Sequence, residues 1–141
     1  MDLKMMIKAH AKELGIDKIG FTTADNFAAL KPSLLAQKAA GHTTGFEHQN
    51  IDERLYPDKI FDQPQSIIAI ALAYPAKIHE RPPRTGPKRG RFARASWGID
   101  YHTVLDRKMA SLIKFIKRTA ENDPNLRFKP MVDTGELIDV V

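Results

Sequence analysis

A stretch rich in proline and glycine, residues 75–98, most constrains how this chain can fold. It contains four prolines and three glycines. Proline removes a backbone donor and glycine lacks the side chain that packs an element, so the stretch excludes a regular helix or strand. Regular structure therefore has to lie on either side of it. Connections this long in compact domains are functional or disordered.

Before this stretch, segments with helical spacing of apolar residues alternate with segments that have the spacing of strands. The spacing predicts a helix capped by Asp2 and stopped at Gly15, a strand over 16–22 and a helix over 32–40. Residues 41–65 are rich in turn formers, with a short helix expected near 58–61. The run 67–74 is continuously apolar, which is typical of a strand buried on both faces.

The best helical pattern follows the stretch. Asp100 is placed to cap a helix whose apolar face carries Leu105, Met109, Leu112 and Ile116. Residues 127–132 then predict a strand. Alternating helices and strands indicate an α/β class, with α+β as the alternative, built as a central mixed sheet flanked by helices. A length of 141 residues predicts one domain.

Composition excludes several classes of protein. The chain has no cysteine, so it cannot itself form disulfides, thiolate zinc sites or iron–sulfur ligation. Its histidines form no H-x-x-x-H or H-E-x-x-H pair, and we expect no metal site. No apolar run reaches the ~20 residues of a membrane span, and the charged N-terminus does not resemble a signal peptide. We therefore expect a cytoplasmic protein without membrane contact.

Positive charge is concentrated in one part of the chain. Residues 77–118 carry a formal charge of +9, whereas the remainder carries −4. Within this part, residues 77–94 are basic at irregular spacing. Such a segment can neutralise phosphates without reading base edges. A solvated basic loop without a partner is the alternative that the residues alone leave open.

Asp133 is the strongest candidate for acid–base chemistry. It follows the expected strand over 127–132, at the strand end where open α/β sheets bind ligands. We expect the flanking Met131, Val132 and Leu137 to desolvate the carboxyl and raise its pKa, which suits a general acid. The alternative has equal weight: Asp133 or Thr134 caps a helix beginning near Glu136.

The segment 97–102 combines two aromatic rings, a glycine and two ionisable groups beside the basic stretch. It is typical of a lip that holds a flat ligand or a stacked base. Alternatively, Trp97 and Tyr101 only anchor the start of the helix.

Four motifs, in order, resemble the N-terminal part of the epoxyqueuosine reductase family. They are residues 13–22; residues 45–47 continuing through Arg54 and Pro57 to 66–75; residues 93–105; and residues 132–135. Together they cover nearly the whole chain. No single motif is specific for this family, but the four motifs in this order are.

The resemblance implies a cobalamin-dependent reductase that removes the epoxide oxygen of epoxyqueuosine at the tRNA wobble position. It implies a corrinoid on this part of the chain, a following ferredoxin-like domain with iron–sulfur clusters, and Asp133 as proton donor. The cofactor contacts implied are Arg54, Ser96, Trp97, Tyr101 and Asp133. The tRNA contacts implied are Arg84, Lys88, Arg89, Arg91, Arg94 and His102.

Several features depart from the family pattern. Glu136 stands where the family usually has proline, and Tyr56 stands where it often has aspartate. The cluster cysteines are missing, so we expect residues 1–141 to be an incomplete N-terminal fragment without the ferredoxin-like domain. Such a fragment would be inactive alone and prone to self-association through exposed surface. Two alternatives stay open: a non-catalytic tRNA- or RNA-binding module, and a related corrinoid reductase with another substrate.

Overall fold

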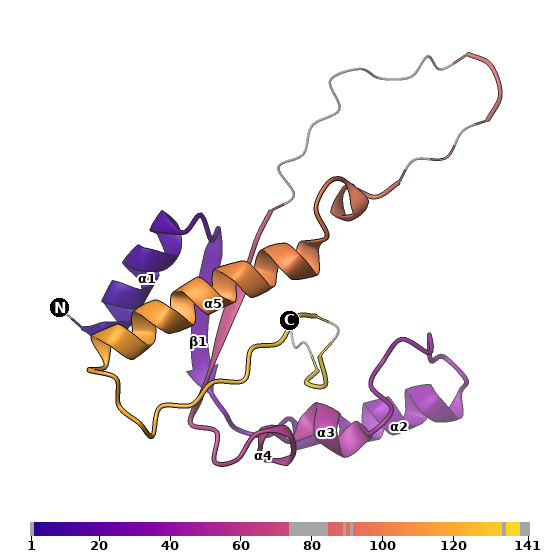
Figure 1. Ribbon diagram of the computed structural model, residues 1–141. Coiled ribbons are helices and arrows are strands. Elements are labelled where there is room, and N and C mark those ends of the chain that lie inside the picture. The colour runs from indigo at the N-terminus through magenta and orange to yellow at the C-terminus, as the bar shows by residue number, and fades with distance from the viewer. Residues whose placement is uncertain (1, 74–84, 89, 91, 134, 139–141) are drawn as a thin grey trace. The chain divides into compact units, whose positions relative to one another are not determined.

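The computed structural model describes residues 2–73, 85–88, 90, 92–133 and 135–138 (Figure 1). The chain falls into two compact units. The first comprises Met1–Lys18 and Ile70–Leu126, and the second comprises Ile19–Ala69 and Arg127–Val141. Each unit is described by itself below.

Two helices packed against each other form the first unit: α1 (Leu3–Glu13) and α5 (Tyr101–Thr119) (Figure 1). Their shared core consists of Ile7, Ala11, Ile16, Leu112 and Ile116, all nearly inaccessible to solvent. Burial of the four isoleucine and leucine side chains, each contributing about 1.5–3 kcal/mol, holds the pair together. The helical face predicted for residues 105–116 is therefore confirmed.

The end of α1 explains the role of Gly15. Its φ of +71° lies in the left-handed region, and its N–H donates to the carbonyl of Lys12 at 2.9 Å. The next amide, of Ile16, donates to the carbonyl of Ala11. The Lys108 ammonium of α5 donates to the carbonyl of Leu14. These bonds satisfy carbonyls that a helix end leaves without partners, which confirms the predicted stop.

Strands β1 (Lys18–Thr23) and β2 (Ser66–Ala71) form a two-stranded sheet. The Asp17 amide donates to the carbonyl of Ala71, so the start of β1 meets the end of β2 and the pair is antiparallel. The chain thus combines helices with a small antiparallel sheet, the α+β form of the predicted class. The expectation that β2 is buried on both faces is wrong among the described residues, because its isoleucines are only half-buried.

Four short helical elements lie in the described part of the second unit, between its two strands. A 3-10 turn, η1 (Ala28–Leu30), leads into α2 (Lys31–Ala39), and α3 (Ile51–Leu55) and α4 (Pro57–Ile60) follow (Figure 1). The sequence analysis missed α3. Its signal is the Asn50 side chain, which accepts hydrogen bonds from the amides of Asp52 and Glu53. The fully buried Leu55 ends the helix.

Two expectations near the C-terminus are wrong for the described residues. Residues 127–132 belong to no strand, and Pro130 has no N–H to donate to a ladder. No helix covers residues 135–138 either, so the structure does not support Asp133 as a helix cap. Between β2 and α5, the one short element in the described part is a 3-10 turn, η2 (Arg94–Ser96). No helix among the described residues is long and apolar enough to cross a membrane.

Candidate active site

Asp133 lies in a tight turn of the second unit. The Gly135 amide donates to the carbonyl of Val132 at 2.7 Å and closes the turn. A Cβ atom at position 135 would come within 3.0 Å of both Met131 Cβ and the Val132 carbonyl oxygen, so the close approach requires glycine. Asp133 itself is exposed, and the expectation that its apolar neighbours would bury the carboxyl is wrong.

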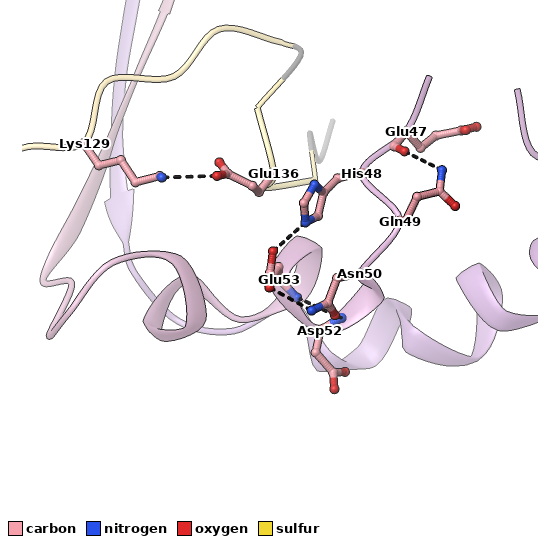
Figure 2. Close-up of polar contacts among 8 residues, drawn as sticks. All are labelled: Glu47, His48, Gln49, Asn50, Asp52, Glu53, Lys129 and Glu136. Carbon is pink, nitrogen blue, oxygen red and sulfur yellow. Dashed lines mark hydrogen bonds and ion pairs between the residues drawn. The ribbon is translucent and has the colours of Figure 1, made fainter. Parts of the chain in front are cut away.

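The turn is fastened on its C-terminal side. The Ile138 amide donates to the carbonyl of Arg54, the half-buried residue of α3 that the resemblance implies as a cofactor contact. Glu136 forms an ion pair with Lys129 across the turn, with Nζ and Oε1 3.2 Å apart (Figure 2). These two contacts join both sides of the turn to each other and to α3.

Local charges favour the ionised form of Glu136. The pKa of this carboxyl is lowered, first by a hydrogen bond from its own backbone amide, then by the Lys129 ammonium and by the charge of His48. Partial burial opposes the shift but is outweighed. Glu136 is therefore a carboxylate at neutral pH.

A second polar group lies beside this turn. His48 Nε2 is 2.5 Å from a carboxylate oxygen of Glu53, and the other oxygen of Glu53 accepts from the Asn50 side-chain amide at 2.8 Å (Figure 2). Both His48 and Glu53 are about one-third exposed. Their arrangement fixes the imidazole against α3.

The loop before His48 folds around a carboxylate. The side chain of Glu47 accepts from the amides of Thr44 and Gly45 at 2.9–3.1 Å, and Gly45 has a φ of +84°. Hydrogen bonds from backbone amides lower the pKa of Glu47 to about 2. The Thr44 amide contributes most, followed by the amide of Glu47 itself. The loop presents Phe46 almost fully to solvent.

This geometry predicts how the loop responds to acid. The folded pKa of Glu47 lies below the ordinary 4.5, so the carboxylate stabilises the loop above that value and the effect is lost as pH falls towards 2. In NMR spectra, the amide shifts of Thr44 and Gly45 should titrate with a midpoint near 2. Glu47→Gln should abolish this transition. A midpoint near 4.5 would mean that the carboxylate does not hold the loop.

The aromatic segment expected to bind a flat ligand lies in the first unit. The Trp97 indole N–H donates to the carbonyl of Phe92 at 3.2 Å, and Gly98 takes a φ of +82°. The Tyr101 and His102 rings lie 4.1 Å apart at the start of α5. Phe92 and Ile99 are strongly exposed, at 82% and 64%. The segment thus presents apolar surface next to aromatic and hydroxyl groups.

Asp100 orders the end of this segment. Its side chain accepts from the His102 amide at 2.8 Å and lies 3.0 Å from the His102 imidazole. Burial acts to raise the pKa of Asp100, but the bonds from the His102 amide and imidazole outweigh it and lower that pKa. The predicted helix cap is confirmed.

The structure therefore distributes the predicted site residues over two units. Ser96, Trp97, Tyr101, His102 and Arg94 share one segment of the first unit, whereas Asp133 and Arg54 belong to the second. Lys88 and Arg94 are exposed; Arg84, Arg89 and Arg91 lie outside the described residues. The described residues contain no cluster of side chains that could hold a metal ion.

Sequence reasoning missed the polar residues around the Asp133 turn. Lys129 and Glu136 come from one stretch of sequence, and His48 and Glu53 come from another. The only signal was the acidic residue directly after Gly135, which departs from the resembled pattern.

Comparisons with known proteins place this chain among reductases of one family. The sequence profile described as "Epoxyqueuosine reductase QueG, DUF1730" matches residues 54–134. An epoxyqueuosine reductase of Listeria monocytogenes is 59% identical over 98% of this chain. The match covers 36% of that relative, so the chain spans about a third of the length of the curated relatives it matches.

Solved structures agree with this assignment. A crystal structure of an epoxyqueuosine reductase with an epoxyqueuosine-modified tRNA-Tyr stem loop is 46% identical, with a TM-score of 0.86 over 97% of this chain and 36% of that one. A Bacillus subtilis epoxyqueuosine reductase, whose catalytic loop bearing an aspartate is swung out of the active site, is 44% identical. Its TM-score is 0.84, again over 97% of this chain and 36% of that one.

Proposed function

We propose, from the premise that this chain belongs to the epoxyqueuosine reductase family, that it forms the N-terminal part of the catalytic domain of such a reductase. In this part, Asp133 donates a proton to the substrate. The observation that carries the proposal is the turn at Asp133, closed by Gly135 and fastened to α3; Asp133 and Arg54 themselves lie within the span that the family profile matches. The reductase from Bacillus subtilis with a catalytic aspartate loop supports this role.

The chemistry requires a proton donor at the epoxide. Conversion of an epoxide to an alkene releases the oxygen as water and uses two electrons and two protons. Negative charge develops on the oxygen as its bond to carbon breaks, and a carboxylic acid placed within hydrogen-bond reach can protonate it. Asp133 is exposed on its turn and thus open to a substrate. Bound cobalamin would supply the electrons.

The residues of the first unit fit a corrinoid chemically. A corrin ring has an apolar face and a rim of amides, and the segment 92–102 exposes Phe92 and Ile99 next to hydroxyl and imidazole groups. We propose that Ser96, Trp97 and Tyr101 contact the cofactor. Arg54 and Asp133 are further cofactor contacts that the family resemblance implies. Iron–sulfur clusters do not fit this chain, which has no cysteine to ligate them.

The partner we propose is tRNA that carries epoxyqueuosine. The relative bound to a modified stem loop supports it, as does the exposure of Lys88 and Arg94. These two cations and His102, with the basic residues 84, 89 and 91, would neutralise backbone phosphates. A cytoplasmic location follows from this partner.

Titration of the purified chain with cob(II)alamin tests the proposal. We expect a change in the absorbance and EPR spectra of the cobalt, and no change on adding it to bovine serum albumin. Trp97→Ala should weaken binding, whereas Leu35→Ala, on the exposed face of α2, should not. An unchanged spectrum with a chain whose circular dichroism shows folded helices would contradict cofactor binding and favour an RNA-binding module.

A further inference from the structure

The Asp133 turn has contacts that its own closure does not require. Gly135 and Val132 already close the turn through one hydrogen bond. Beyond it, Glu136 pairs with Lys129, and the Ile138 amide bonds to the carbonyl of Arg54. The two side chains of the ion pair are each about one-third exposed, so the pair is partly shielded from solvent.

Two basic side chains lie beside Glu136. Lys129 pairs with it from the segment before the turn, and His48 lies nearby on the loop before α3 (Figure 2). His48 is itself held by Glu53, whose other oxygen accepts from Asn50. The imidazole therefore cannot turn freely, and its position relative to α3 is set.

We infer that Glu136, paired with Lys129, is a positioning residue that holds the Asp133 turn in shape, so that its Ile138 end stays bonded to α3. The inference deepens the proposed function and rests on it, because the turn matters for catalysis only if Asp133 delivers the proton. When this clasp of Glu136 and Lys129 is released, the turn loses the side-chain pair that joins its two sides. A small displacement of a reacting group can lower a rate by about a hundredfold.

Amide hydrogen exchange in this chain tests the clasp without any activity. Glu136→Gln keeps the size of the side chain but removes its charge, and should raise the exchange rate of the Ile138 amide by about two- to fivefold. Lys129→Met should do the same, and Lys129→Arg should restore protection. The matched control is Lys31→Met, which breaks a 2.7 Å pair with Asp52 on α3 itself but leaves the pair within the turn intact, and it should leave Ile138 unchanged.

The amide of Tyr56, which donates to the carbonyl of Asp52, reports whether the second unit is folded. If Tyr56 stays protected while Ile138 exchanges at the same rate in Glu136→Gln and in the unaltered chain, the inference is wrong. It is also wrong if Ile138 is unprotected in the unaltered chain while Tyr56 is protected.

Turnover shows whether the clasp positions Asp133. The turnover assay uses a chimeric protein. In it, this chain replaces the matching segment of the Listeria monocytogenes reductase, which supplies the rest of the enzyme. Glu136→Gln should lower kcat of the chimera about tenfold with little change in KM for tRNA, and Lys129→Arg should retain more activity than Lys129→Met. Faster exchange without a fall in kcat would overturn the positioning role. If the unaltered chimera shows no turnover, the proposed function is contradicted. The exchange data would then still show whether the pair of Glu136 and Lys129 stabilises the turn.

Discussion

Replacement of Asp133 by asparagine is expected to lower turnover of the chimera by about a thousandfold. Asparagine has nearly the same shape but carries no carboxyl proton, so it removes the proposed proton donor and little else. General acids typically contribute 10²–10⁴-fold to a rate. Cobalamin and tRNA binding should stay close to those of the unaltered chimera, because the loss affects the chemical step. The measurements are single-turnover conversion of modified tRNA and a cob(II)alamin titration.

Asp123→Asn is the matched control. Asp123 lies in an exposed turn, where its side chain accepts from the Asn125 amide, and asparagine can accept the same bond. It should leave turnover unchanged. Full turnover in Asp133→Asn would remove this residue from the mechanism. Equal loss of cobalamin binding and turnover would instead make Asp133 a cofactor contact alone.

The parts of the fold that sequence predicted are those with strong local signals. The helix over 101–119 has a capping aspartate and a long apolar face, and Gly15 marks the end of the first helix with a residue suited to positive φ. The helix over 51–55 was missed because a five-residue helix is too short to show a period. Residues 127–132 belong to no strand, because Pro130 cannot donate to a ladder and because strand formation depends on a partner that sequence does not reveal.

The candidate site was predictable only in its motifs. Asp133 and the segment 97–102 stand out because unusual residue types are adjacent in sequence. The contacts around the turn do not stand out in the sequence, since Arg54 and Ile138 are far apart in the chain and are joined only after folding. The sequence analysis gave Gly135 no role of its own, whereas the structure shows that it is needed for close approach to Met131 and Val132. Burial was misjudged for Asp133, because apolar neighbours in sequence did not cover it.

Leu55→Ala should have the largest effect on stability. Leu55 is fully inaccessible to solvent, and truncation of buried leucines typically costs about 2–5 kcal/mol. Its carbonyl also accepts from the Phe27 amide, so a shift of this residue disturbs the chain entering α2. We expect the free energy of opening, measured from hydrogen exchange of the Tyr56 amide, to fall by about 3 kcal/mol.

The second consequence of Leu55→Ala concerns the Asp133 turn. The neighbouring Arg54 supplies the carbonyl that holds Ile138, so loosening of α3 should release Ile138 as well. Leu35→Ala is the matched control, because Leu35 is about half exposed and its truncation should change stability by less than ~0.5 kcal/mol. If Leu55→Ala exposes Tyr56 to exchange but leaves Ile138 protected, α3 does not support the turn. If both amides lose protection together, the buried leucine and the proton donor's turn belong to one cooperative structure.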